Sequence, residues 1–90
     1  MEKVSINLVA ASDFKKINGN SLKISKSQQC IKIIDYISKK LGMNASDIFL
    51  YQREYAIYPD TYIGELCDHI SGFSEDTAID IFYGSRSSYG

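Results

Sequence analysis

Apolar and polar residues alternate at the start of the chain. Over residues 4–10 every second side chain up to Leu8 is apolar, which is the pattern of a β-strand with one buried face. A shorter alternation at 22–25 predicts a second strand. We therefore expect a hairpin in which Val4, Ile6 and Leu8 face the core.

The turn of this hairpin has two possible positions. Asn18-Gly19 is a recognised tight-turn signal, because both residues tolerate the backbone angles that two-residue turns require. The turn could instead lie nearer Ser12-Asp13, with a bulged second strand that begins at Lys15. The pattern of side chains leaves both positions open.

Apolar residues recur at helical spacing over residues 30–41. The intervals of four, three and four residues predict an amphipathic helix whose apolar stripe faces the core. Ser25 or Ser27 can cap its beginning, and Gly42 supplies a stop signal. The stripe comprises Cys30, Ile34, Ile37 and Leu41, with Ile33 beside it.

The second half of the chain predicts four shorter elements. Residues 47–51 are β-branched and aromatic, as in a buried strand, and a short strand at 55–56 follows. Residues 58–61 have the composition of a turn and lead into a short helix at about 62–70. Residues 77–83 alternate again and predict the last strand.

This order of strands and helices is that of the β-grasp fold. It belongs to the α+β class, with one main helix across one face of a mixed sheet and a second short helix. Ninety residues suffice for one such domain, which we place at 1–83. Residues 84–90 lack periodicity, and we expect them to form a flexible tail. The sheet face without the helix is a natural protein-binding surface.

Charge is balanced overall but uneven along the chain. The net charge of −1 argues against nucleic-acid binding, which usually requires a basic surface. Residues 1–45 hold eight basic and three acidic side chains, whereas residues 46–90 hold two and eight. A fold that brings the two halves together would partly neutralise itself.

The sequence contains no recognised catalytic pattern. Cys30 and Cys67 are far apart and outside any CxxC pair, His69 is the sole histidine, and the glycines form no phosphate-binding loop. We expect core cysteines and neither enzyme activity, cofactor nor metal site. Since no signal peptide or long apolar run is apparent, we expect a soluble cytoplasmic protein.

The final residue, Gly90, presents a carboxylate with no side chain beside it. Such a carboxylate can enter a narrow enzyme cleft, be activated as an acyl-adenylate, pass to a thioester and be transferred to a lysine. A Cβ at this position would crowd the nucleophile and restrict the backbone. Because about 7% of residues are glycine on average, a final glycine can occur by chance and is weak evidence for conjugation by itself. It supports conjugation only because the β-grasp order of elements precedes it.

Most of the chain, from about Lys3 to Gly90, resembles the family of the ubiquitin-like autophagy protein twelve. Ile57 stands where that family usually has Pro, and Tyr89 replaces its usual Trp before the final glycine. The tail after Tyr83 has the family's length. The matching residues are Ile33-Ile34-Asp35-Tyr36-Ile37 in the helix, then Ile48-Phe49-Leu50-Tyr51, Tyr55-Ala56, Pro59-Asp60, Gly64 and Leu66.

The resemblance implies a modifier of other proteins. Gly90 would be activated by an E1-type enzyme, autophagy protein seven, carried by the E2-type protein ten, and joined to a lysine of protein five. With protein sixteen, the conjugate would promote lipid attachment to the protein eight modifiers as an E3-like factor in autophagosome formation. It would recruit protein three, the E2 for that step, and would meet autophagosome precursor membranes only through the complex.

The resemblance also implies site residues. Gly90 would be the conjugation site, and Tyr89 would be recognised by the enzymes. The sheet surface for protein three would include Lys3, Ser21 and Leu22. The residues for noncovalent contact with protein five would be Tyr55, Ala56, Ile57, Pro59 and Asp60. For all of these except Gly90, plain packing or turn geometry is the alternative.

Two other functions are compatible with the fold. The chain could be a noncovalent ubiquitin-like interaction module, of the same pathway or of a larger scaffold, because some relatives lack the glycine and bind protein five without a covalent bond. A sulfur carrier shares the fold but normally ends in Gly-Gly, whereas this chain ends in Ser88-Tyr89-Gly90. The retained glycine favours conjugation.

Overall fold

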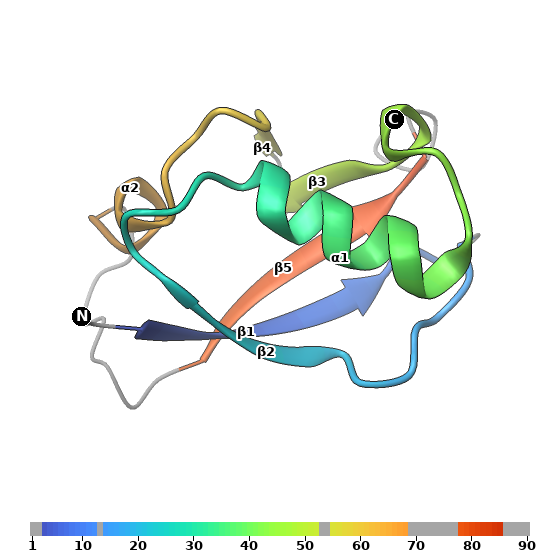
Figure 1. Ribbon diagram of the computed structural model, residues 1–90, viewed down its shortest axis with the longest axis horizontal. Helices are drawn as coiled ribbons and strands as arrows, with labels where there is room; N and C mark the ends of the chain where they lie inside the picture. Colours follow the sequence, from blue (N-terminus) through green and yellow to red (C-terminus); the bar gives the residue numbers. More distant parts are fainter. Residues whose placement is uncertain (1–2, 13, 53–54, 69–77, 86–90) are drawn as a thin grey trace.

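A five-stranded mixed sheet with one helix across a face forms the framework of the computed structural model (Figure 1). The structure describes residues 3–12, 14–52, 55–68 and 78–85. The strands lie in the order β2-β1-β5-β3-β4, and only the central β1–β5 pair is parallel among these pairings. The elements are β1 (Lys3–Ala10), β2 (Ser21–Ser25), α1 (Ile31–Leu41), the 3-10 helix η1 (Ala45–Asp47), β3 (Phe49–Gln52), β4 (Tyr55–Ile57), α2 (Ile63–Asp68) and β5 (Ile79–Gly84). The predicted β-grasp order is confirmed.

The core lies between the sheet and α1. Alternate residues of β1 and β5 face it, and both predicted sets are confirmed as buried. Burial of each such side chain contributes about 2 kcal/mol. The helix buries Ile34 and Ile37 of the predicted stripe and Ile33 beside it, whereas Leu41 is only partly buried. The buried aliphatic residues of these three elements are Val4, Ile6, Leu8, Ile33, Ile34, Ile37, Ile79 and Ile81.

The connection between β1 and β2 is a loop and not a two-residue turn. The ladder ends with Asn7 opposite Ser21. Gly19 has a φ of 70°, but the predicted tight turn at Asn18-Gly19 is wrong, because residues 11–20 separate the two strands. The alternative, a strand that begins at Lys15, is wrong.

Tyr83 of β5 holds this loop in place through its side chain. Its side chain is 1% exposed, and its hydroxyl accepts a hydrogen bond from the Ile17 backbone N–H at 3.0 Å. The same hydroxyl donates to the Lys15 carbonyl at 3.1 Å, and the Phe14 ring packs edge-on against the tyrosine ring. The loop is therefore fixed to the end of β5.

The start of α1 differs from the prediction. Neither predicted serine caps the helix: the hydroxyls of Ser25 and Ser27 form a hydrogen bond with each other at 2.9 Å. Cys30 is the N-cap residue of the helix, and its backbone N–H donates a hydrogen bond to the Thr61 carbonyl at 2.8 Å. The other end is as predicted, because Gly42, with a φ of 66°, closes the helix.

Two boundaries in the second half shift by one or two residues, and a third is not tested. The predicted strand at 47–51 begins only at Phe49, because Asp47 belongs to η1. α2 spans Ile63–Asp68, and the predicted continuation to Ile70 lies outside the described residues. β5 continues through Gly84, one residue beyond the predicted end of the domain, because Gly84 pairs with Phe49.

Replacing Tyr83 by Phe tests the role of its hydroxyl. We expect the free energy of unfolding to fall by about 1–3 kcal/mol, since the buried Ile17 N–H would lose its acceptor. Denaturant unfolding measures the change, with Tyr58→Phe as control because Tyr58 is 70% exposed. Equal stability of the two variants would show that the hydroxyl does not hold the loop.

Candidate functional site

The tail begins at an anchored point, which we call the tail root and define as Gly84 and Ser85. Gly84 is buried and pairs with Phe49, and the Ser85 carbonyl accepts a hydrogen bond from the Tyr51 hydroxyl at 2.8 Å. The five residues that follow, including Tyr89 and Gly90, lie outside the described residues. A five-residue segment spans at most about 17 Å when fully extended, so Gly90 stays within that distance of the tail root.

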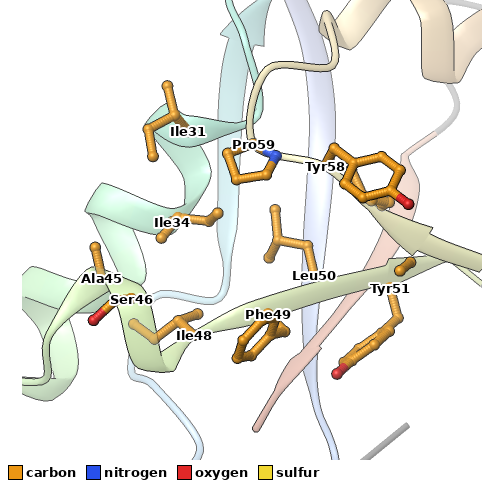
Figure 2. A pocket seen from close by; sticks show the side chains of 12 residues that line it. Ile31, Ile34, Ala45, Ser46, Ile48, Phe49, Leu50, Tyr51, Tyr58 and Pro59 are labelled. Carbon is orange, nitrogen blue, oxygen red and sulfur yellow. The ribbon is translucent and has the colours of Figure 1, made fainter. Parts of the chain in front are cut away.

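An apolar groove lies beside the tail root. It has a volume of about 480 Å³ and runs between α1, β3 and the connection from β4 to α2. Ile31 and Ile34 form the helix wall, residues 48–51 the floor, and residues 56–59 the opposite wall. Figure 2 shows Leu50 pointing from β3 into the space between Ile34 and Pro59. The groove is suited to apolar side chains of a protein partner.

Backbone hydrogen bonds hold the wall at 56–59 against the start of α1. The Ile31 N–H donates to the Pro59 carbonyl at 2.8 Å, and the Thr61 N–H donates to the Tyr58 carbonyl at 3.0 Å, which closes the predicted turn. The Gln29 side-chain amide donates to the Asp60 carbonyl at 3.2 Å. These bonds place Tyr58, which is 70% exposed, at the rim of the groove.

The predicted contact residues for protein five divide between two hollows. Ala56, Ile57 and Pro59 line the groove. Tyr55 is 73% exposed and lines a second hollow, which Ala56 and Ile57 share. The Asp60 side chain is exposed and lines neither hollow. The structure therefore brings three of the five residues together in the groove.

Outside the predicted contact segment at 55–60, sequence reasoning missed all of the groove's lining residues as site residues: Ile31, Ile34, Ala45, Ser46, Ile48, Phe49, Leu50 and Tyr51. Tyr58 lies inside that predicted contact segment, whereas Ile34 was assigned only to the core stripe and Ile31 was given no role. One signal was available: Ile31 extends the apolar surface of the helix beyond the predicted stripe, and it is only partly buried. No such signal pairs it with Pro59, which is 28 residues away in the chain.

The three residues predicted for the protein three surface do not share a face. Lys3 and Ser21 lie on the face away from α1, at opposite ends of the β1–β2 ladder. Leu22 pairs with the buried Ile6 and packs against the core, so its predicted place on the exposed face is wrong. The placement came from the resemblance, whereas the alternation along β2 puts Leu22 on the same face as the buried Ile24.

The face away from α1 has an apolar row beside a polar one. The registers align Val9, Phe82, Tyr51 and Ala56 across four strands, and Val9 and Phe82 are 37% and 40% exposed. In the neighbouring row the Asn7 amide donates to the Asp80 carboxylate at 3.2 Å. The predicted open sheet face thus includes an exposed apolar strip that ends close to the tail root.

Both cysteines lie in the core, as predicted. Cys30 is 0% and Cys67 5% exposed. Burial, reinforced by the negative charge of Glu65, raises the pKa of the Cys30 thiol from 9.0 to about 12, and burial also raises the pKa of Cys67. Within the described residues no group of acidic, histidine or cysteine side chains is arranged to hold a metal ion. None of the helices in that part is long and apolar enough to cross a membrane.

Thiol labelling tests this assignment of the cysteines. The raised pKa lowers the thiolate fraction of Cys30 roughly a thousandfold below that of an unfolded chain at the same pH, so labelling at mildly alkaline pH should be slow. Denaturant should accelerate the labelling of both residues to the rate of a free thiol. Rapid labelling of the folded protein, detected by mass, would instead indicate a reactive cysteine.

The topology, with a main helix across a five-stranded sheet around a parallel central pair, defines a ubiquitin-like β-grasp protein. The family model described as ubiquitin-like autophagy protein Apg12 matches residues 3–90. The chain belongs to this family, which confirms the resemblance read from the sequence.

A solved structure supports the fold independently. The crystal structure of ATG8 from Trypanosoma brucei superposes with a TM-score of 0.77 at 12% sequence identity, over 99% of this chain and 78% of that chain. At this identity the likeness establishes the fold alone. No curated protein matches the chain.

Proposed function

We propose that this ubiquitin-like autophagy protein is joined through Gly90 to a lysine of autophagy protein five. The observation that carries the proposal is the match of the family model through the terminal glycine, on a domain whose last strand ends in an anchored tail root. The tail root supports the proposal, because it holds the final glycine within about 17 Å of a fixed point on the domain.

In this account the chain is a substrate and supplies no catalytic group. The Gly90 carboxylate attacks the α-phosphate of ATP on the E1-type protein seven, with release of pyrophosphate. A cysteine thiolate then displaces AMP to form a thioester, which passes to the E2-type protein ten. The amine of the acceptor lysine attacks the thioester carbonyl, the thiol leaves, and an isopeptide bond remains. The absence of a Cβ at Gly90 keeps each attack unhindered.

The apolar groove is the proposed noncovalent docking site for protein five. Any protein that holds the Gly90 carbonyl lies within about 17 Å of the tail root. The groove begins at the tail root, since Phe49 and Tyr51 line the groove and also contact the tail root. Apolar side chains of protein five would displace water from the walls formed by Ile34 and Pro59. Binding in the groove would hold the acceptor lysine near the thioester.

The remaining roles follow from the family. The conjugate, with protein sixteen, would promote lipid attachment to the protein eight modifiers, and the sheet face that carries Lys3 and Ser21 would recruit protein three. The protein would be cytoplasmic and reach autophagosome precursor membranes through the complex. A noncovalent module of the same pathway is the second candidate, because docking in the groove needs no chemistry at the tail.

Deleting Gly90 separates the two candidates. Incubation with ATP, proteins seven and ten, and protein five should give one covalent product from the intact chain and none from the deletion variant. Gly90→Ala should slow its formation, because the added Cβ crowds the carbonyl. Mass spectrometry of the product detects whether a single amide bond joins the two proteins. Ser88→Ala is the control, because it changes the tail without changing Gly90. Binding of protein five without any covalent product from the intact chain would favour the noncovalent module.

Tyr58→Asp tests the groove separately from the tail. In a chain that lacks Gly90, this change should weaken binding of protein five about tenfold, because it places a charge at the rim of an apolar interface. Tyr62→Asp is the matched control, since Tyr62 is 48% exposed and lies outside the groove lining. Titration calorimetry measures both affinities. Equal losses for the two variants would contradict docking in the groove.

A further inference from the structure

Four exposed lysines belong to the end of the molecule from which the tail leaves. We call them the basic end: Lys15 and Lys16 in the β1–β2 loop, and Lys39 and Lys40 in the last turn of α1. Figure 1 shows this loop, the C-terminal end of α1 and the end of β5 at the same end of the molecule. Segments that are far apart in the sequence therefore combine their charge beside the tail root.

Specific contacts hold these segments together. The Tyr36 hydroxyl of α1 donates a hydrogen bond to the Gly19 carbonyl of the loop, and the Lys40 ammonium lies 5.6 Å from the centre of the Tyr36 ring. On the other side, the Tyr83 hydroxyl donates to the Lys15 carbonyl. Since Tyr83 is two residues before Ser85, the loop lysines are placed relative to the tail root.

The acidic side chains of the described chain lie mostly elsewhere. Asp35, one turn before Lys39, and Asp47 of η1 are the acids on the elements that carry or adjoin the basic end. Glu65 and Asp68 lie on α2, which Figure 1 places at the opposite end. No ion pair joins any of the four lysines to another described residue.

Stabilisation of α1 explains the position of only two of the four lysines. Lys39 and Lys40 complement the partial negative charge at the C-terminus of α1. Lys15 and Lys16 lie in no helix, and their backbone is fixed to β5 instead. The common location of the two pairs of lysines therefore points to a role that both pairs share.

We propose that the basic end binds an acidic surface of the E1-type enzyme that activates the tail, and so steers the tail into its cleft. This inference rests on the proposed function. A protein surface is favoured over a membrane, because the tail leaves from the same end and must reach an enzyme cleft within about 17 Å. Complementary charge raises the association rate, and salt reduces the effect.

The test compares two charge-reversed double variants under identical conditions. Lys15→Glu/Lys16→Glu alters the basic end, and Lys23→Glu/Lys32→Glu makes the same charge change at exposed positions in β2 and the first turn of α1. Thioester formation with the E1-type enzyme and saturating ATP gives kcat/KM and kcat. Circular dichroism and thermal unfolding confirm that both variants fold.

At low salt we expect kcat/KM of Lys15→Glu/Lys16→Glu to fall about tenfold with kcat unchanged, since charge at the binding surface alters association more than chemistry. The loss should shrink to about twofold near 0.5 M salt. The control variant should stay within about twofold of the unmodified chain throughout.

Equal kcat/KM and equal salt dependence for the two variants would overturn the proposal. Loss of binding to anionic phospholipid vesicles by Lys15→Glu/Lys16→Glu, with unchanged thioester formation, would overturn it in favour of a membrane surface. If the unmodified chain forms no thioester at all, the proposed function itself is wrong, and the inference falls with it.

Discussion

The pairing of β5 with β1 on one side and β3 on the other holds the tail root in place. A shift of one residue in either register would turn Ile79 and Ile81 from the core to the open face, so the register is strongly specified. Because β5 is central, its C-terminal end cannot move without breaking two ladders. The position at which the tail leaves the domain therefore depends on the burial of alternate apolar side chains far from the tail.

Three surfaces meet around this fixed point. The apolar groove lies toward β3 and β4, the exposed apolar strip with Phe82 lies on the open sheet face, and the basic end lies toward the β1–β2 loop. A modifier must present one short tail to several proteins in succession. Under the proposed function, separate surfaces of different chemistry would allow each partner to be recognised by its own contacts while Gly90 is passed between them.

The sequence was sufficient for the fold but not for the site. Period-two and helical patterns identify the buried faces of β1, β5 and α1, because each depends only on local spacing. The groove depends on Ile31 meeting Pro59 through a backbone hydrogen bond, which no local pattern encodes. Leu22 was placed on the open face by resemblance, although it alternates along β2 with the buried Ile24 and shares its face. The role of Gly90 was predicted from chemistry and resemblance, and it stays a prediction because Gly90 lies outside the described residues.

The central claim is that the last carbonyl of this chain becomes bonded to a lysine of another protein. Trypsin cleaves after Arg86, so a conjugate isolated from cells should yield a branched peptide in which Ser87-Ser88-Tyr89-Gly90 is attached to a lysine side chain. Tandem mass spectrometry detects that remnant directly. The account predicts a single acceptor lysine that carries it, on autophagy protein five. Recovery of the chain only with a free terminal carboxylate, while it remains bound to its partners, would contradict the claim.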